Sequence, residues 1–301
     1  MKLSVVIATR DRAGFLSKAL DSLDAQVGAP AFEVVVVDNG SSDATPEVVA
    51  ERAARGSLEV RRIVVPEPNR GAARNAGIAA ARGAIVVFVD DDVFVPEGFL
   101  AAHAAAHAGV FPLAVSGPIL NVPSYAHQPK PGPLNYSRAF FCTCNVSVPR
   151  NALLAAGGFD ADFNLYGWED TELGLRLRRR DVRRAFAWKA YLYHIKPPRV
   201  ETLDAVLNKT VERARMAARF LATDDGPRTR LATGAYALNL WRAQLLAPAW
   251  SQGVARRLAE DATLPGPLRS LARAQLLDAA YVSTLRTALE AARDASEVSP
   301  D

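Results

Sequence analysis

The sequence is poor in cysteine, in long apolar runs and in net charge. Its two cysteines, Cys142 and Cys144, are too few for a disulfide framework or a zinc site, so we expect two reduced thiols near the core. The longest apolar run covers residues 84–89, whereas a membrane-spanning helix needs about 20 apolar residues. Lys and Arg number 36 against 32 Asp and Glu, and this small excess gives no reason to expect a nucleic-acid partner.

Two further absences narrow the class of protein. The first residues form a short apolar stretch without the cleavage site of a signal peptide, so we expect a cytoplasmic location. No Gly-x-Gly-x-x-Gly pattern follows this stretch, which argues against a dinucleotide-dependent oxidoreductase.

What the sequence does contain is typical of a globular α/β protein. Half of its residues are apolar and 23% are charged, which excludes global disorder. Short, mostly apolar strands that alternate with helices predict a mostly parallel, Rossmann-like sheet with helices on its faces. The predicted strands are 3–8, 33–37, 60–65 and 84–89, and the predicted helices between them are 14–24, 45–54 and 72–81.

The rest of the chain is less regular and ends in a helical region. We expect an irregular loop over 112–138, strands at 142–148 and 185–195, and helices at 151–156 and 168–180. Later residues are rich in Ala, Leu and Arg, with apolar helical stripes over 203–221 and 231–245 and a last helix over 268–292. We therefore divide the chain into an α/β domain, 1–198, and a C-terminal α-helical extension, 199–301.

Asp90, Asp91 and Asp92 directly follow the most apolar predicted strand. Three adjacent carboxylates repel one another unless water or a cation compensates their charge. Ligands of parallel sheets bind at the carboxyl ends of the strands, and oxygen ligands suit Mg²⁺ or Mn²⁺ that also holds phosphate. The triplet therefore indicates a binding site for a metal-bound anion, and a solvated acidic turn is the alternative.

A second carboxylate pair, Glu169 and Asp170, lies at the start of a predicted amphipathic helix. The helix dipole favours ionised carboxylates at that end, and an ionised carboxylate near a hydroxyl is a general base. Ordinary helix capping is the alternative interpretation. His103 and His107 are one turn apart but lack the glutamate of a zinc-protease motif, so we expect them on a helix surface.

Together these motifs resemble the family 2 glycosyltransferases with the GT-A fold, over roughly residues 3–196. Each motif is weak alone, but their order along the chain makes the resemblance specific. They are VIATRDR at 6–12, VVDNGSSD at 36–43, NRGAARNAG at 69–77, FVDDD at 88–92, NVSV at 145–148, GGFD at 157–160 and GWED at 167–170.

The resemblance implies a nucleotide-sugar donor, a divalent metal (Mn²⁺ or Mg²⁺) and inversion at the anomeric carbon. It implies that Asp170 is the base for the acceptor hydroxyl, with Glu169 beside it. The acceptor side would be formed by Trp168, Asn145 and Gly158, and the metal ligands would be Asp92, Asp90 and His194. The donor contacts that it implies are Ala8, Thr9, Arg10, Arg12, Asp38, Gly71, Arg74, Asn75, Asp90 and Asp91.

The expected activity is transfer of a sugar from a UDP- or dTDP-sugar to a hydroxyl of a carbohydrate, lipid-linked or other acceptor, in polysaccharide, glycolipid or glycoconjugate biosynthesis. A sugar-nucleotide nucleotidyltransferase is the runner-up, although residues 8–12 lack the Gly-rich, lysine-containing loop of that family. A non-catalytic nucleotide-sugar-binding module is a third hypothesis. In the extension, Trp241, Leu245, Leu246 and Trp250 are candidates for a peripheral membrane contact. The alternatives for the same residues are a helical core and a homo-oligomer surface.

Overall fold

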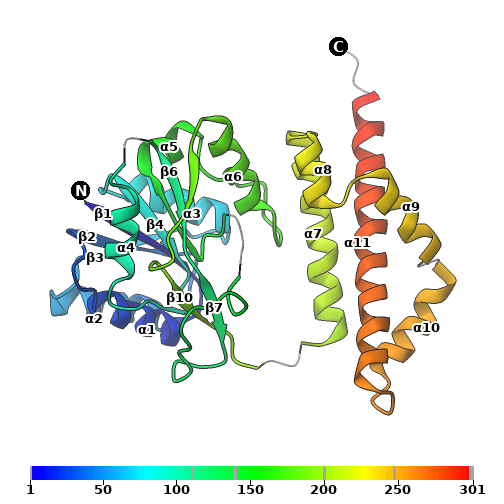
Figure 1. Ribbon diagram of the computed structural model, residues 1–301, viewed down its shortest axis with the longest axis horizontal. Helices are drawn as coiled ribbons and strands as arrows, with labels where there is room; N and C mark the ends of the chain where they lie inside the picture. The colour runs from blue at the N-terminus through cyan, green and yellow to red at the C-terminus, as the bar shows by residue number, and fades with distance from the viewer. Residues whose placement is uncertain (1, 110, 138–140, 199–200, 247–248, 298–301) are drawn as a thin grey trace. The chain divides into compact units, whose positions relative to one another are not determined.

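The computed structural model describes residues 2–109, 111–137, 141–198, 201–246 and 249–297, without the side chains of 242–246, 249–250 and 292–297. The chain divides into two compact units, whose elements are drawn in Figure 1. The first unit comprises Met1–Asn164 and Glu169–Pro198. The second comprises Leu165–Trp168 and Arg199–Asp301. Residues 165–168 therefore interrupt the first unit along the sequence and belong to the second.

The first unit is built on a seven-stranded sheet, within the residues described, with the order β3-β2-β1-β4-β8-β6-β9. The neighbours β3, β2, β1 and β4 are parallel, β8 is antiparallel to both β4 and β6, and β9 is parallel to β6. This mostly parallel sheet confirms the predicted fold class. The strands are β1 (Leu3–Thr9), β2 (Phe32–Asp38), β3 (Val60–Val64), β4 (Ile85–Val89), β6 (Leu113–Ser116), β8 (Asn145–Pro149) and β9 (Arg183–Phe186).

Helices cover both faces of this sheet because its central strands are apolar on both sides (Figure 1). In β1, Val5 and Ile7 pack into one core cluster and Val6 packs into the other. The first cluster includes residues of α1 (Ala13–Asp24), α2 (Thr45–Arg55) and α4 (Phe99–Ala106). The second includes residues of α3 (Arg70–Ala80), α5 (Arg150–Ala155) and α6 (Glu169–Arg179).

A second, three-stranded sheet has the order β5-β10-β7, with β5 (Val93–Phe94), β10 (Leu192–Ile195) and β7 (Ile119–Val122). Strand β5 begins directly after Asp92 and pairs antiparallel with β10, which places His194 opposite Val93. The backbone N–H of Ile195 donates a 2.8 Å hydrogen bond to the carbonyl of Asp92. These pairings bring His194 next to the acidic triplet.

Three predictions for the middle of the chain were wrong. The expected loop over 112–138 contains β6 and β7, the expected strand at 185–195 is divided between β9 and β10, and the strand expected from 142 begins at Asn145. Strands of four or five residues offer too few alternations to show a periodicity, and Gly117 and Pro118 between β6 and β7 look like loop residues.

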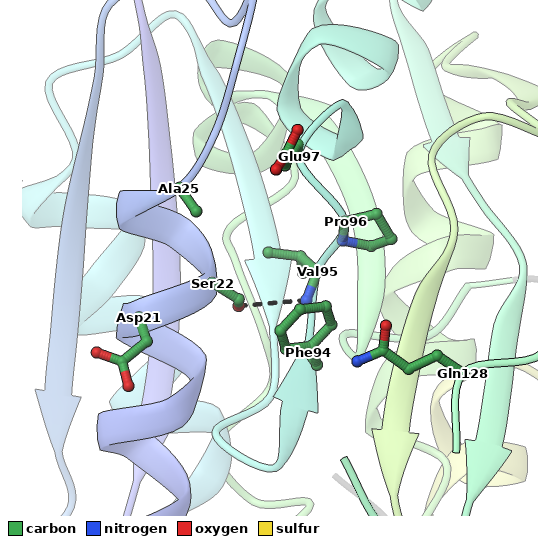
Figure 2. Close-up of a pocket in the computed structure, with 8 residues that line it drawn as sticks. All are labelled: Asp21, Ser22, Ala25, Phe94, Val95, Pro96, Glu97 and Gln128. Atoms are coloured by element: carbon green, nitrogen blue, oxygen red, sulfur yellow. Dashed lines mark hydrogen bonds between the residues drawn. The ribbon is translucent and has the colours of Figure 1, made fainter. Parts of the chain in front are cut away.

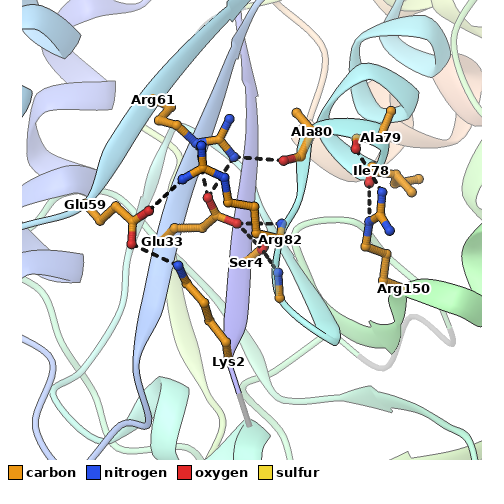
Figure 3. A network of polar contacts seen from close by, with 11 residues as sticks. Lys2, Ser4, Glu33, Glu59, Arg61, Ile78, Ala79, Ala80, Arg82 and Arg150 are labelled. Atoms are coloured by element: carbon orange, nitrogen blue, oxygen red, sulfur yellow. Dashed lines mark hydrogen bonds and ion pairs between the residues drawn. The ribbon is translucent and has the colours of Figure 1, made fainter.

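A buried carboxylate joins the amino-terminal ends of β1 and β2 (Figure 3). Glu33 is fully buried and accepts hydrogen bonds from the Ser4 hydroxyl at 2.7 Å, the Arg82 backbone N–H at 2.6 Å and the Arg61 guanidinium at 2.7 Å. Burial opposes ionisation, but these donors outweigh it and lower the pKa of Glu33. The charge at this end of the sheet is therefore compensated by the protein's own groups.

The prediction that His103 and His107 lie on a helix surface was wrong. Both are buried, and each places a ring nitrogen 2.8 Å from the Ser147 hydroxyl on β8. The second ring nitrogen of His103 lies 3.0 Å from the amide oxygen of Asn145. The two histidines therefore fasten α4 to β8 through hydrogen bonds, which single-helix spacing could not reveal.

The second unit is helical, as expected for the C-terminal extension, and Figure 1 shows its helices. Its core contains small residues of α7, Ala214 and Ala217, together with Leu221, Ala235 and Leu285. The helices are α7 (Leu203–Thr223), α8 (Pro227–Thr233), α9 (Ala237–Leu246), α10 (Ala249–Glu260) and α11 (Gly266–Glu297). In the ranges described, none of the helices combines the length and the apolar character that crossing a bilayer requires.

The apolar stripe predicted over 231–245 does not exist as one helix face. Gly234, with a φ of 74°, ends α8 in the left-handed conformation, and α9 begins after it. Leu231, Leu238 and Trp241 are exposed. The side chains of the other residues invoked for a membrane contact lie outside the described residues; they are Leu245, Leu246 and Trp250.

The buried histidines predict a specific acid sensitivity. Burial lowers the pKa of His103 and of His107 to about 4, whereas the unfolded chain protonates histidine near pH 6.5. The unfolded state therefore binds more protons below pH 6.5, and from pH 8 to pH 5 the free energy of unfolding falls by about 2 kcal/mol for each histidine. Urea unfolding at both pH values measures this, and a double variant, His103→Gln with His107→Gln, should lose most of that dependence. An unchanged pH dependence in the double variant would contradict the account.

Candidate functional site

The site forms where three segments of the first unit meet at the carboxyl end of β4. Antiparallel pairing places Val89 opposite Asn145, so the next residues, Asp90 and Cys144, also lie opposite each other. The pairing of β5 with β10 adds His194. One candidate ligand atom from each of Asp90, Cys144 and His194 lies within 4.8 Å of the other two.

The other two carboxylates of the triplet are held by the loop after β1. Thr9 donates its hydroxyl to Asp91 at 2.7 Å, and one nitrogen of Arg12 lies 2.7 Å from Asp91 and 2.8 Å from Asp92. Arg12 thus bridges two adjacent carboxylates that would otherwise repel each other. Asp91 is fixed by its protein partners, which leaves Asp90 and Asp92 as the carboxylates nearest His194.

Burial and neighbouring charges act differently on the three carboxyl groups. Burial raises the pKa of Asp91 to about 6, although Arg12 and Thr9 act against this. Burial also raises the pKa of Asp90, against the charge of Arg74. For Asp92, His194 and Arg12 outweigh burial and lower the pKa. Asp92 is therefore the carboxyl group of the triplet best stabilised as an anion.

Asp92 and His194 meet the geometric requirement for two ligands of one metal ion. Nε2 of His194 lies 3.1 Å from Oδ1 of Asp92, and this buried oxygen has no hydrogen bond of good geometry from any residue that the structure describes. Two neighbouring ligands of an octahedral Mg²⁺ or Mn²⁺ are about 3 Å apart, since each bond is about 2.1 Å. The residues present therefore fit a divalent cation.

A second charged group, next to the triplet, contains the predicted base. The guanidinium of Arg74 on α3 lies 3.4 Å from Glu169 and 3.8 Å from Asp170, and it stacks over the ring of Phe159. Its charge also acts on Asp90. Arg74 is thus a shared counterion between the triplet and the carboxylates that begin α6.

Asp170 is held in place by the segment that precedes β8. The backbone N–H and the hydroxyl of Thr143 donate to its Oδ2 at 3.0 and 3.1 Å, while its Oδ1 is buried and accepts no hydrogen bond from the described residues. Burial and the charge of Asp170 raise the pKa of Glu169, and Arg74 acts against this. Because Thr143 adjoins Cys144, Asp170 and the triplet lie at the same end of the sheet.

Gly71, Asn75 and Gly158 form a structural joint between α3 and the turn before α6. The amide of Asn75 donates to the carbonyl of Phe159 at 2.8 Å and accepts from its N–H at 2.7 Å. Gly158 has a φ of 68°, and a Cβ there would lie 2.4 Å from Oδ1 of Asn75. A Cβ on Gly71 would lie 3.2 Å from the carbonyl of Asp160. The polar atoms of Asn75 are therefore engaged with this turn, although the sequence suggested a donor contact.

Several other predicted site residues have different surroundings from those expected. Asn145 is almost fully buried and hydrogen-bonds to Pro118, Ala190 and His103, whereas the sequence suggested an acceptor contact. Both oxygens of the buried Asp38 are engaged, by the Ser41 N–H and by Arg62.

The remaining predicted residues are Arg10, Ala8 and Trp168. Arg10 is half-exposed and pairs with Asp11 at 3.7 Å, and Ala8 packs at the edge of the second core cluster. Trp168 belongs to the second unit, where its indole N–H donates to the carbonyl of Arg213 at 2.9 Å. Its φ of 75° explains why α6 begins one residue later than predicted.

Sequence reasoning missed two residues of this site, Thr143 and Cys144. Only the register of β4 with β8 brings them next to Asp170 and Asp90, and no local pattern encodes that register. The one sequence signal that could have indicated these two residues is that they end a loop and directly precede an apolar strand.

A separate pocket of about 460 Å³ lies between α1 and the segment after β5 (Figure 2). Its walls include Ser22, whose hydroxyl accepts a 3.2 Å hydrogen bond from the N–H of Val95. None of the predicted site residues lines it; the lining residues are Asp21, Ser22, Ala25, Phe94, Val95, Pro96, Glu97 and Gln128. The candidate site is therefore defined by the charged groups around β4.

Comparison with known sequences identifies the family that the first part of this chain resembles. The sequence model of Glycosyl transferase family 2 matches residues 4–123. Validoxylamine A glucosyltransferase of Streptomyces hygroscopicus subsp. limoneus is 30% identical over 60% of this chain and 48% of its own length. The chain spans about half the length of the first such relatives. The resemblance to family 2 glycosyltransferases is thereby confirmed.

Comparison with solved structures supports the same fold. A mannosyltransferase of Pyrobaculum calidifontis, in complex with GDP-Man and Mn²⁺, has a TM-score of 0.64 at 21% identity and covers 95% of this chain and 86% of its own. TarS 1–349 of Staphylococcus aureus with UDP-GlcNAc has a TM-score of 0.57 at 19% identity and covers 98% of this chain and 92% of its own. The GT-A fold is therefore shown.

The joint at Gly158 yields a stability prediction. Gly158→Ala should destabilise the first unit by about 2–3 kcal/mol, because a positive φ costs alanine about 1 kcal/mol and the new methyl displaces Asn75 from its hydrogen bonds. In an Asn75→Ala background the same change should cost only about 1 kcal/mol, as a double-mutant cycle by urea unfolding measures. Gly98→Ala is the matched control, since no atom lies within 4 Å of its new Cβ. Equal costs for Gly158→Ala in both backgrounds would contradict this role.

Proposed function

We propose that this protein is an inverting glycosyltransferase that moves a sugar from a nucleoside-diphosphate donor, a UDP- or dTDP-sugar, to an acceptor hydroxyl. The observation that carries the proposal is the juxtaposition at the end of β4. A metal-compatible pair, Asp92 and His194, and a candidate base, Asp170, are held by adjacent segments of one sheet edge. A transfer reaction needs both functions near one anomeric carbon.

On the donor side, Asp92, Asp90 and His194 would hold the divalent metal, either Mn²⁺ or Mg²⁺. When bound, such a cation offsets the negative charge that develops on the leaving diphosphate. Arg12 keeps Asp92 ionised and positioned, and Asp91 anchors Arg12 in turn. Arg12 and Asp91 thus position Asp92 to bind the cation that would offset the charge of the leaving diphosphate.

On the acceptor side, Asp170 would remove the proton from the attacking hydroxyl. Thr143 fixes one carboxylate oxygen through two hydrogen bonds, and the other oxygen is left without a hydrogen bond from the described residues, so it can accept that proton. Glu169 would be a second catalytic carboxylate next to Asp170, and Arg74 is its counterion. A single displacement, in which the acceptor hydroxyl attacks the anomeric carbon opposite the leaving diphosphate, gives inversion, so no carboxylate nucleophile is required.

The relatives support a nucleotide-sugar donor as a class but differ in the nucleotide. One structural neighbour holds GDP-Man with Mn²⁺ and another holds UDP-GlcNAc. The acceptor class that we propose, a hydroxyl of a carbohydrate, a lipid-linked sugar or another compound in glycan or glycoconjugate biosynthesis, rests on the chemistry of Asp170.

The helical unit has its own candidate surface. Leu231, Leu238 and Trp241 are 71%, 67% and 60% exposed, far more than large apolar side chains in a core. A peripheral membrane contact or a homo-oligomer contact through this unit remains a prediction, and vesicle binding and sedimentation distinguish the two.

Donor binding should depend on metal. A ligand present at 100 times its Kd stabilises the folded state by about 2.7 kcal/mol, so the correct nucleotide sugar with Mn²⁺ should raise the melting temperature by several degrees. Thermal-shift screening of UDP-, dTDP- and GDP-sugars with and without Mn²⁺ measures this. Asp92→Asn should abolish the metal-dependent part, and Glu47→Gln on the exposed surface of α2 should not. A shift that is equal without metal, or in Asp92→Asn, would contradict the metal assignment.

Asp170→Asn should separate binding from transfer. The asparagine keeps an oxygen for Thr143 but has no group that can accept a proton, so nucleoside-diphosphate release should fall by about 100-fold or more. The donor-dependent thermal shift should stay close to that of the wild type. Glu169→Gln is the matched control and should lose less activity. Full activity in Asp170→Asn would rule out this base, and donor binding by the wild type without turnover on any acceptor would indicate a binding module.

Pyrophosphate release from a nucleoside triphosphate and a sugar phosphate would instead indicate the nucleotidyltransferase alternative.

A further inference from the structure

The metal-compatible cluster contains a thiol to which the proposed reaction assigns no role. Cys144 is only 2% exposed, and its sulfur lies within 4.8 Å of a carboxylate oxygen of Asp90 and a ring nitrogen of His194. The sulfur is therefore placed beside two side chains that can ligate a metal ion.

Backbone pairing fixes the position of this sulfur. The register that sets Val89 opposite Asn145 leaves Cys144 facing Asp90, and the pairing of β10 with β5 delivers His194. Cys142, two residues earlier and less buried, is not a member of the cluster. The chain therefore offers its own matched control for the role of a thiol at this end of the sheet.

We propose that Cys144 is a direct ligand of the divalent metal held by Asp90 and His194. This inference rests on the metal site of the proposed function and extends it, because a sulfur ligand changes which metal the protein prefers. Thiolates favour Zn²⁺ and Co²⁺, whereas Mg²⁺ is held by oxygen ligands. The site should therefore bind Zn²⁺ and Co²⁺ more tightly than an oxygen-and-nitrogen site would, and Mg²⁺ should gain nothing from the sulfur.

The geometry permits this coordination with small movements. Bonds of 2.0–2.3 Å to a tetrahedral ion place its ligand atoms about 3.5 Å apart. Atoms that lie within 4.8 Å of one another need to approach by about 1.3 Å at most, which side-chain rotation achieves. On binding, the S–H bond is replaced by a sulfur–metal bond, the proton passes to solvent, and no atom changes oxidation state.

Titration with Co²⁺ tests the proposal, because a thiolate ligand gives Co²⁺ an intense near-ultraviolet charge-transfer band. The full chain is titrated without any nucleotide sugar, as wild type, Cys144→Ser and Cys142→Ser. We expect the band in the wild type and in Cys142→Ser and its loss in Cys144→Ser. Competition should show Co²⁺ and Zn²⁺ binding weakened by about tenfold or more in Cys144→Ser, with Mg²⁺ binding unchanged.

Cadmium NMR on the wild type keeps the test decisive if Cys144→Ser fails to fold. A ¹¹³Cd resonance in the range of a mixed sulfur, nitrogen and oxygen site supports the proposal, and one in the range of oxygen and nitrogen ligands overturns it. A Co²⁺ spectrum without a charge-transfer band, or a band that Cys142→Ser removes and Cys144→Ser keeps, also overturns it. The metal titration contains no donor, so its outcome does not depend on sugar transfer, which is assayed separately. Sulfur ligation without sugar transfer would refute only the proposed function, and transfer without sulfur ligation would refute only this inference.

Discussion

The antiparallel pairing of β8 with β4 is the constraint on which the rest of the site depends. It turns the chain so that residues 142–145 lie against the end of β4, where the acidic triplet begins. Thr143 then donates hydrogen bonds to Asp170, and Cys144 lies near Asp90. The next residue, Asn145, is hydrogen-bonded to His103. A shift of one residue in this register would exchange the faces of Thr143 and Cys144 and separate the groups that it now joins.

Charge compensation distinguishes the two ends of the sheet. At the amino-terminal end the protein's own donors satisfy Glu33. At the carboxyl end Arg12 and Arg74 each serve more than one carboxylate, while oxygens of Asp92 and Asp170 stay buried without a hydrogen bond from the described residues. Such groups are costly to bury, and in the proposed function a bound cation and an acceptor hydroxyl would compensate them.

Local sequence patterns were sufficient for the parts of the fold and site that local chemistry determines. The strands β1 to β4, the acidic triplet after β4 and the amphipathic helix that begins at Glu169 could all be predicted. Long-range pairing determined what could not be predicted: the short strands β6 and β7, the burial of His103 and the presence of Cys144 in the cluster. The hydrogen bonds of Asn145 could not be predicted for the same reason, because its partners Pro118 and Ala190 come from distant segments.

The central claim is that one sheet edge holds both the diphosphate-binding metal and the base. Crystals grown with Mn²⁺ and a nucleoside diphosphate, measured at the manganese absorption edge, test it most directly. The account predicts an anomalous peak bonded to Asp92 and His194, with the terminal phosphate on the side that faces Asp170. A peak elsewhere on the chain, or a diphosphate bound away from Asp170, would contradict it.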